Sequence, residues 1–159
     1  MPAGTPSAVP DRDTLQKLAE TVTARSWRVA TAESVTAGLV ADGLAQAPDA
    51  SDWFLGGVVA YATEVKQRLL DVAPGPVVNP ETAEQMARGV ARLLDAQVAV
   101  ATTGVGGPEP QEDQPAGRVW VGVYVDGEVT THRLDVDGDP EDVCTGATDE
   151  ALRLLVERL

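Results

Sequence analysis

The chain has 159 residues, 43% of them hydrophobic and 23% charged, which suits one globular domain with a real core. The formal net charge of -13 argues against nucleic-acid binding, because that binding needs clustered Lys and Arg and this chain has 12 in all. No apolar run is long enough to cross a bilayer, residues 1–10 lack the pattern of a signal peptide, and Cys144 is the only cysteine. These features predict a cytoplasmic protein without membrane contact or disulfide bonds.

The beginning of the chain divides into a tail and a helix. Residues 1–10 are rich in Pro, Ala, Gly and Ser without periodicity, which predicts a disordered tail ahead of a single domain over 11–159. Asp11 or Asp13 is a suitable N-cap for a first helix. Its inward face is predicted from the apolar residues at helical spacing, namely Leu15, Leu18, Ala19 and Val22.

The next segments predict alternating strands and helices. Residues 28–31 predict a strand, and a helix-like run that includes Leu39, Val40 and Leu44 follows and ends at Pro48. Residues 55–62 predict a second, buried strand, since Val58, Val59 and Ala60 are all apolar. A short helix carrying Val65, Leu69 and Leu70 comes next, and the prolines within 72–78 predict a loop.

Asn79 and Pro80 predict the start of a longer helix, because Asn is a good N-cap and Pro suits the first helical position. One side of that helix is predicted to hold Ala83, Met86, Ala87, Val90, Leu93 and Leu94. Residues 97–101 predict a third, fully apolar strand that ends at a glycine-rich loop over 102–108. The polar and acidic segment 109–115 is expected to be mobile.

The last third of the sequence predicts a hairpin and a helix. Residues 118–125 alternate between valine and other residues, Asp126-Gly127 is a strong two-residue turn, and 128–136 is the partner strand. The final helix begins at Pro140 or Glu141 and runs to the C-terminus. The order of elements predicts an α/β fold: a three-layer α/β/α sandwich with a mixed, mostly parallel sheet of about five strands that includes one hairpin.

Two predicted strand-to-helix junctions are candidate binding sites, because ligands of α/β sheets bind where strands end and helix amides are free. Ser34 and Thr36 lie at the first junction. Ser34 is either a nucleophile that needs a neighbouring base or simply a helix cap. At the end of the third strand, residues 103–108 either cradle an anion with their backbone amides or form a plain glycine-rich turn.

Few residues could serve as the base that a Ser34 nucleophile would need. His132 is the only histidine and lies in the middle of a predicted strand, so a Ser-His-Asp arrangement is not favoured. Lys66 remains, since burial lowers the pKa of a lysine and frees its amine; the alternative is a solvated helix face. No Cys or His spacing matches a metal site, so neither a metal nor another cofactor is expected.

Four ordered stretches resemble the CinA C-terminal domain: 31–38, 54–61 with Lys66 after it, 81–89 and 101–108. The resemblance covers the chain from about Leu15 to its end. It implies hydrolysis of the amide of nicotinamide mononucleotide to nicotinic acid mononucleotide and ammonia, by serine acyl transfer without a histidine. It also leads us to expect a homo-oligomer, most simply a dimer, that acts on a small nucleotide and binds neither nucleic acid nor membrane.

The resemblance assigns roles to individual residues. Ser34 would be the nucleophile, Lys66 its base, and Tyr61 would assist proton transfer or position the substrate. The residues implied to line the substrate pocket are Thr36, Thr103, Gly104 and Gly106.

The sequence also departs from the family pattern. Val35 and Ala37 replace a cysteine and a glycine, the loop over 109–114 is acidic and lengthened, and Pro140 and Cys144 stand where the family has arginines. Those arginines could reach a substrate phosphate or carbonyl, so we expect reduced activity toward the mononucleotide. A second function stays open on this basis: a non-catalytic nucleotide-binding or interaction protein that kept the fold.

Overall fold

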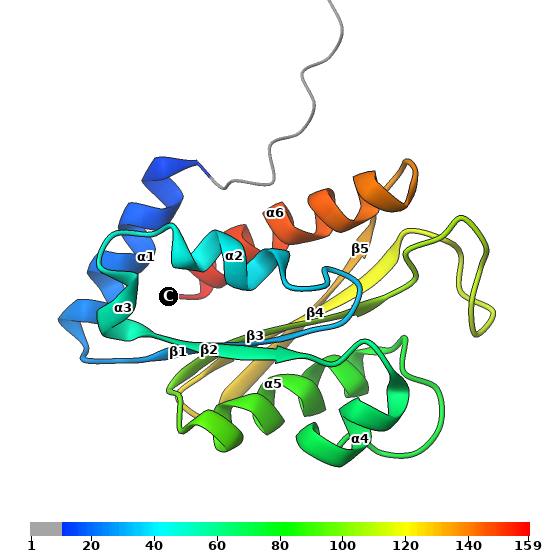
Figure 1. Ribbon diagram of the computed structural model, residues 1–159, viewed down its shortest axis with the longest axis horizontal. Helices are drawn as coiled ribbons and strands as arrows, with labels where there is room; N and C mark the ends of the chain where they lie inside the picture. The colour runs from blue at the N-terminus through cyan, green and yellow to red at the C-terminus, as the bar shows by residue number, and fades with distance from the viewer. Residues whose placement is uncertain (1–10) are drawn as a thin grey trace, which may run out of the picture.

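A computed structural model describes residues 11–159, and the predicted disordered tail, residues 1–10, lies outside the described residues. The elements in chain order are α1 (Arg12–Ala24), β1 (Val29–Glu33), α2 (Leu39–Ala45), α3 (Ala50–Trp53), β2 (Phe54–Val59), α4 (Thr63–Leu70), α5 (Pro80–Leu94), β3 (Val98–Gly104), β4 (Arg118–Val125), β5 (Glu128–Asp135) and α6 (Pro140–Arg158). Helices cover both faces of one sheet, which confirms the predicted three-layer sandwich (Figure 1).

The sheet has the strand order β2-β1-β3-β4-β5. β1 pairs in parallel with β2 and with β3, whereas β3 with β4 and β4 with β5 are antiparallel. β5 therefore runs in the same direction as the first three strands, and only β4 is reversed. The sheet is mixed and mostly parallel, and its hairpin turns at Asp126-Gly127 as predicted.

The prediction of a buried second strand is wrong. β2 lies at an edge of the sheet, and the Val59 side chain in it is 51% exposed. A run of apolar residues does not distinguish an edge strand from a central one, because the neighbours that would cover it come from elsewhere in the chain. The single-turn helix α3 was also not predicted; its Trp53 is buried and donates a hydrogen bond from Nε1 to the Pro48 carbonyl, at 3.1 Å.

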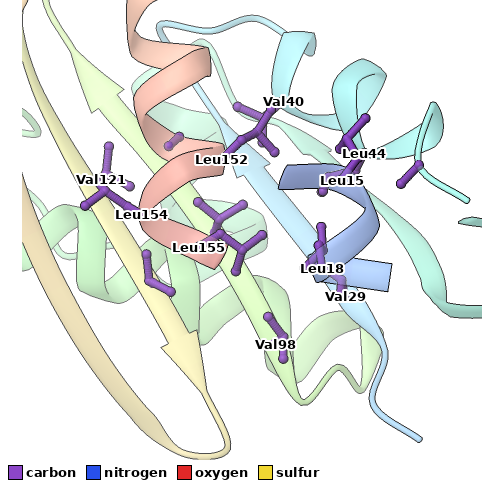
Figure 2. Close-up of a cluster of buried hydrophobic side chains, with 14 of the residues drawn as sticks. Leu15, Leu18, Val29, Val40, Leu44, Val98, Val121, Leu152, Leu154 and Leu155 are labelled. Atoms are coloured by element: carbon purple, nitrogen blue, oxygen red, sulfur yellow. The ribbon is translucent and has the colours of Figure 1, made fainter. Parts of the chain in front are cut away.

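One face of the sheet packs against α1, α2 and α6 (Figure 1). Figure 2 shows this core, in which branched aliphatic side chains of the helices meet valines of the strands. The residues labelled there are Leu15, Leu18, Val29, Val40, Leu44, Val98, Val121, Leu152, Leu154 and Leu155. The predicted inward face of the first helix is confirmed, since Leu15, Leu18, Ala19 and Val22 are all buried.

The opposite face packs against α4 and α5 and is built from smaller residues. In β3 the valines point to the α6 side, whereas Ala99 and Ala101 point to α5. Small side chains let α5 approach the sheet closely: a Cβ at Gly122 would lie 2.5 Å from the Ala83 carbonyl oxygen. Leu93, predicted to face this core from α5, is instead 48% exposed.

Helix starts are specified locally at three places. Asp11 caps α1 by accepting from the Thr14 amide at 2.9 Å, and Asn79 caps α5 by accepting from the Thr82 amide at 2.8 Å, both as predicted. Asp139 and Asp142 form a capping box at the start of α6. α2 is different, because its N-cap is Gly38 and no side chain of that residue can serve.

Candidate active site

A cavity of about 410 Å³ lies at the carboxyl ends of β1 and β3. Its wall comes from the turn after β1, the start of α4, the loop before α5 and the connection between β3 and β4. The lining residues are Ser34, Val35, Tyr61, Ala62, Thr63, Lys66, Val77, Val78, Thr103, Gly104, Gly106, Gly107, Gln111 and Glu112. The structure thus brings together the predicted site residues, with the exception of Thr36.

Ser34 follows β1 directly and is 7% exposed. Its backbone amide is held by the Thr102 carbonyl oxygen at 3.1 Å, but its hydroxyl takes part in no hydrogen bond formed within residues 11–159. The alternative interpretation, in which Ser34 caps α2, is therefore wrong. The backbone of Ser34 thus holds this residue at the cavity without a hydrogen bond to its hydroxyl from residues 11–159.

Glu33 performs the capping in its place. The carboxylate is 1% exposed and accepts hydrogen bonds from the amides of Gly38 (3.2 Å), Val40 (2.8 Å) and Ala41 (3.0 Å), and from the Thr36 hydroxyl at 2.6 Å. A negative charge at a helix N-terminus also interacts favourably with the helix dipole. Sequence reasoning gave Glu33 no role, although a carboxylate that ends an apolar strand is an unusual residue there.

Thr36 does not line the cavity as predicted. It is fully buried, and its hydroxyl donates to Glu33 while hydrogen-bonding the Thr102 hydroxyl at 2.8 Å. The turn over 34–38 directs this side chain into the protein, where the buried Glu33 carboxylate needs a donor. Thr36 therefore supports the turn that carries Ser34.

Lys66 lies on α4 and is 2% exposed, so its alternative interpretation as part of a solvated helix face is wrong. Its ammonium donates to the Tyr61 carbonyl oxygen at 3.1 Å. Burial lowers the pKa of Lys66, and the nearby Glu112 carboxylate partly opposes that change. The Tyr61 side chain is 72% exposed and stands at the mouth of the cavity.

The second junction differs from its prediction in one respect. β3 does not end at residue 101 but continues through Thr102 and Thr103 to Gly104. The buried Thr103 hydroxyl donates to the Val77 carbonyl oxygen at 2.7 Å, which fastens the loop before α5 to the sheet. Gly104 lines the cavity, and its lack of a side chain is required because a Cβ there would lie 2.7 Å from the Arg118 carbonyl oxygen.

The acidic segment 109–115, expected to be mobile, is anchored through Glu112. The Glu112 carboxylate accepts hydrogen bonds from the Val77 amide at 3.0 Å and from the Val78 amide at 2.8 Å. Figure 1 shows this connection between β3 and β4 projecting from the end of the sheet where the turn after β1 lies. The sequence marked the segment as acidic and lengthened but did not single out Glu112.

Comparison with known proteins places this arrangement in a family. The family model of the CinA C-terminal domain matches residues 11–159, the whole described part of the chain. The chain belongs to the CinA C-terminal domain family. A CinA-like protein of Frankia casuarinae is 43% identical over 136 residues, which cover 82% of this chain and 31% of the relative. The chain spans about a third of the length of the curated relatives it matches.

Solved structures agree with this family assignment. A competence-damaged protein (CinA) superfamily protein from Escherichia coli superimposes with a TM-score of 0.90 at 32% identity, covering 100% of this chain and 94% of its own. The competence damage-inducible protein A from Klebsiella pneumoniae gives a TM-score of 0.87 at 33% identity, covering 92% of this chain and 95% of its own. Each of these two solved structures thus shares the CinA-type fold with this chain along nearly its full length.

Two of the residues that depart from the CinA pattern lie outside the cavity lining. Neither Pro140 nor Cys144, where family arginines were expected, lines the cavity. The Cys144 thiol instead donates to the carbonyl oxygen of Thr36, in the turn that carries Ser34, at 3.4 Å. Burial, with a smaller contribution from the Glu33 carboxylate, raises the pKa of this thiol and keeps it protonated.

The described part of this CinA-family chain holds neither a grouped set of metal ligands nor a membrane-spanning helix. Within residues 11–159 no three His, Cys, Asp or Glu side chains are grouped so as to hold a metal ion. In the same part of the chain no helix is both long enough and apolar enough to cross a membrane.

Proposed function

We propose that this chain is an amidohydrolase that cleaves the amide of nicotinamide mononucleotide, or of a related nicotinamide compound, to the carboxylate and ammonia. One observation carries the proposal: Ser34, whose hydroxyl forms no hydrogen bond within residues 11–159, lines the same cavity as the buried Lys66. Because Glu33 satisfies the amides of α2, Ser34 is not needed as a cap. The choice of substrate rests on the family resemblance.

In the proposed reaction the Ser34 oxygen attacks the amide carbon, and the neutral Lys66 amine accepts the serine proton. The lowered pKa of Lys66 raises the fraction of this neutral amine at a given pH. The backbone N–H of Val35 directly follows the nucleophile and forms no hydrogen bond within residues 11–159, so it is available to the oxyanion. Lys66 then passes this proton to the amide nitrogen, which leaves as ammonia, and water hydrolyses the acyl-serine to the carboxylate and free Ser34.

The experiment is ammonia release from nicotinamide mononucleotide by the purified protein. We expect turnover by the wild-type protein, no turnover by Ser34→Ala, and wild-type turnover by Ser51→Ala, an exposed serine on α3 that serves as the matched control. Loss of a serine nucleophile costs at least about 10³-fold in kcat. Full activity of Ser34→Ala would exclude the proposed mechanism.

The second candidate is a non-catalytic nucleotide-binding protein with the same fold. The departures at Pro140 and Cys144 favour it, since the arginines that the resemblance places there are absent and neither residue lines the cavity. Nucleotide binding by calorimetry without ammonia release from any nicotinamide amide would support this candidate and contradict the amidohydrolase.

A further inference from the structure

The loop before α5 presents two consecutive amides to the cavity. Val77 and Val78 both line it, and their N–H groups point at one carboxylate, that of Glu112. Oε1 accepts from both amides, at 3.0 and 2.8 Å, and Oε2 accepts from the first at 3.0 Å. Neighbouring amides that converge on one acceptor are a common way for proteins to bind carboxylate and phosphate groups.

The position of these amides is fixed from the other side. The Val77 carbonyl oxygen accepts from the buried Thr103 hydroxyl at 2.7 Å, so the loop is tied to β3. Glu112, in contrast, comes from the exposed connection between β3 and β4, 34 to 35 residues away in sequence. The donors are therefore part of the rigid frame, whereas the acceptor is a side chain of an exposed loop.

Glu112 also balances the positive charge of the cavity. Among the residues that line the cavity, the charged residue types are represented by Lys66 and Glu112. Glu112 lies near enough to Lys66 for its charge to act on the ammonium. A ligand with its own anionic group would meet donors already in use and a like charge beside them, whereas an uncharged ligand would meet neither obstacle.

We propose that Glu112 is a specificity-determining residue that takes the place of a ligand's anionic group, so that the cavity prefers an unphosphorylated nicotinamide amide, such as the riboside, to the phosphorylated mononucleotide. This proposal rests on the proposed function for the identity of the amide. It assigns Glu112 to the discrimination between ligands and gives it no part in breaking the amide bond.

Equilibrium binding to protein with the Ser34→Ala replacement tests the proposal without turnover. Nicotinamide riboside and nicotinamide mononucleotide are titrated calorimetrically into this protein with and without Glu112→Gln. Gln keeps an oxygen for the two amides but removes the charge. Glu109→Gln is the matched control, since Glu109 is an exposed acid of the same loop that does not line the cavity.

We expect Glu112→Gln to tighten binding of the mononucleotide by about ten-fold, the size of one removed like-charge interaction near a protein surface, and to leave riboside binding within about two-fold. Glu109→Gln should change neither. Equal changes in the affinities for the riboside and the mononucleotide, or an unchanged affinity for the mononucleotide, would overturn the proposal. Should Glu112→Gln fail to fold, Glu112→Ala is measured in its place with the same expected outcome.

The two proposals fail in different ways. Ser34-dependent ammonia release with an unchanged ratio of the two affinities overturns the role of Glu112 alone. The expected change in that ratio without ammonia release from either compound overturns the amidohydrolase alone.

Discussion

The site holds two buried ionisable groups, Glu33 and Lys66, that differ in how well their charges are satisfied. Glu33 accepts hydrogen bonds from three backbone amides and one hydroxyl, whereas Lys66 donates to a single carbonyl oxygen. A buried charge with a full set of hydrogen-bond partners stabilises its surroundings. A buried charge with few partners is costly to keep, and its neutral form becomes accessible.

The backbone explains this difference. Glu33 stands just before α2, where the first amides of a helix have no partner within it and point toward the incoming chain. Lys66 lies inside α4, whose own amides and carbonyls are bonded to each other, and finds only the Tyr61 carbonyl that precedes the helix. These surroundings show that Glu33 supports the construction of the site, and they support the proposed role of Lys66 in its chemistry.

Lys66→Met should produce the largest effect, a fall in kcat of about 10²–10⁴-fold with KM little changed, because a general base acts mainly in the transition state. The free energy of unfolding at pH 7 should not fall, since methionine fills the same space without a charge to desolvate. Steady-state kinetics and urea unfolding measure both quantities, with the exposed Lys17→Met as control. An effect confined to KM would make Lys66 a binding residue.

Glu33→Gln should give the opposite pattern, a loss of about 2–4 kcal/mol in the free energy of unfolding, because buried amides lose their charged acceptor. Activity should fall with it, since the turn that carries Ser34 loses its support. Glu81→Gln is the control, an exposed acid in the first turn of α5 whose replacement should cost about 0.5 kcal/mol. Native stability of Glu33→Gln would remove the contrast drawn between the two groups.

Ala37→Gly tests the strain in the same turn. Ala37 has φ of 50°, in the left-handed region that favours glycine, and the family resemblance also places a glycine there. We expect the replacement to raise the free energy of unfolding by roughly 0.5–1 kcal/mol, whereas Ala24→Gly at the exposed last residue of α1 should lower it by a similar amount. Destabilisation by both replacements would show that the turn is not strained.

The smallest expected effect is on the pH dependence of activity, which tests the pKa of Lys66. Because burial lowers the pKa of Lys66 from its ordinary 10.5, kcat should rise with pH through a pKa below that value. The Glu112 charge raises the pKa of Lys66, so Glu112→Gln should move this rise to lower pH. Profiles of the two proteins in matched buffers measure the displacement; an unchanged profile would place Glu112 out of range of Lys66.

The sequence by itself determined the elements whose causes are local. The caps at Asp11 and Asn79, the turn at Asp126-Gly127 and the valine alternation of β4 depend on residues a few positions apart, and each was predicted. The family motifs also identified Ser34 and Lys66 as candidates, because both lie in stretches that resemble the CinA C-terminal domain.

Only the tertiary structure decided which side chains face the cavity and which support it. The Thr36 side chain turns inward and donates to Glu33, the Lys66 side chain is buried, and the Glu112 carboxylate binds amides 34 to 35 residues away in sequence. The exposure of β2 was decided in the same way, by its place at the edge of the sheet. These properties depend on partners distant in sequence, and no local pattern of residue types records which distant group will arrive beside a given side chain.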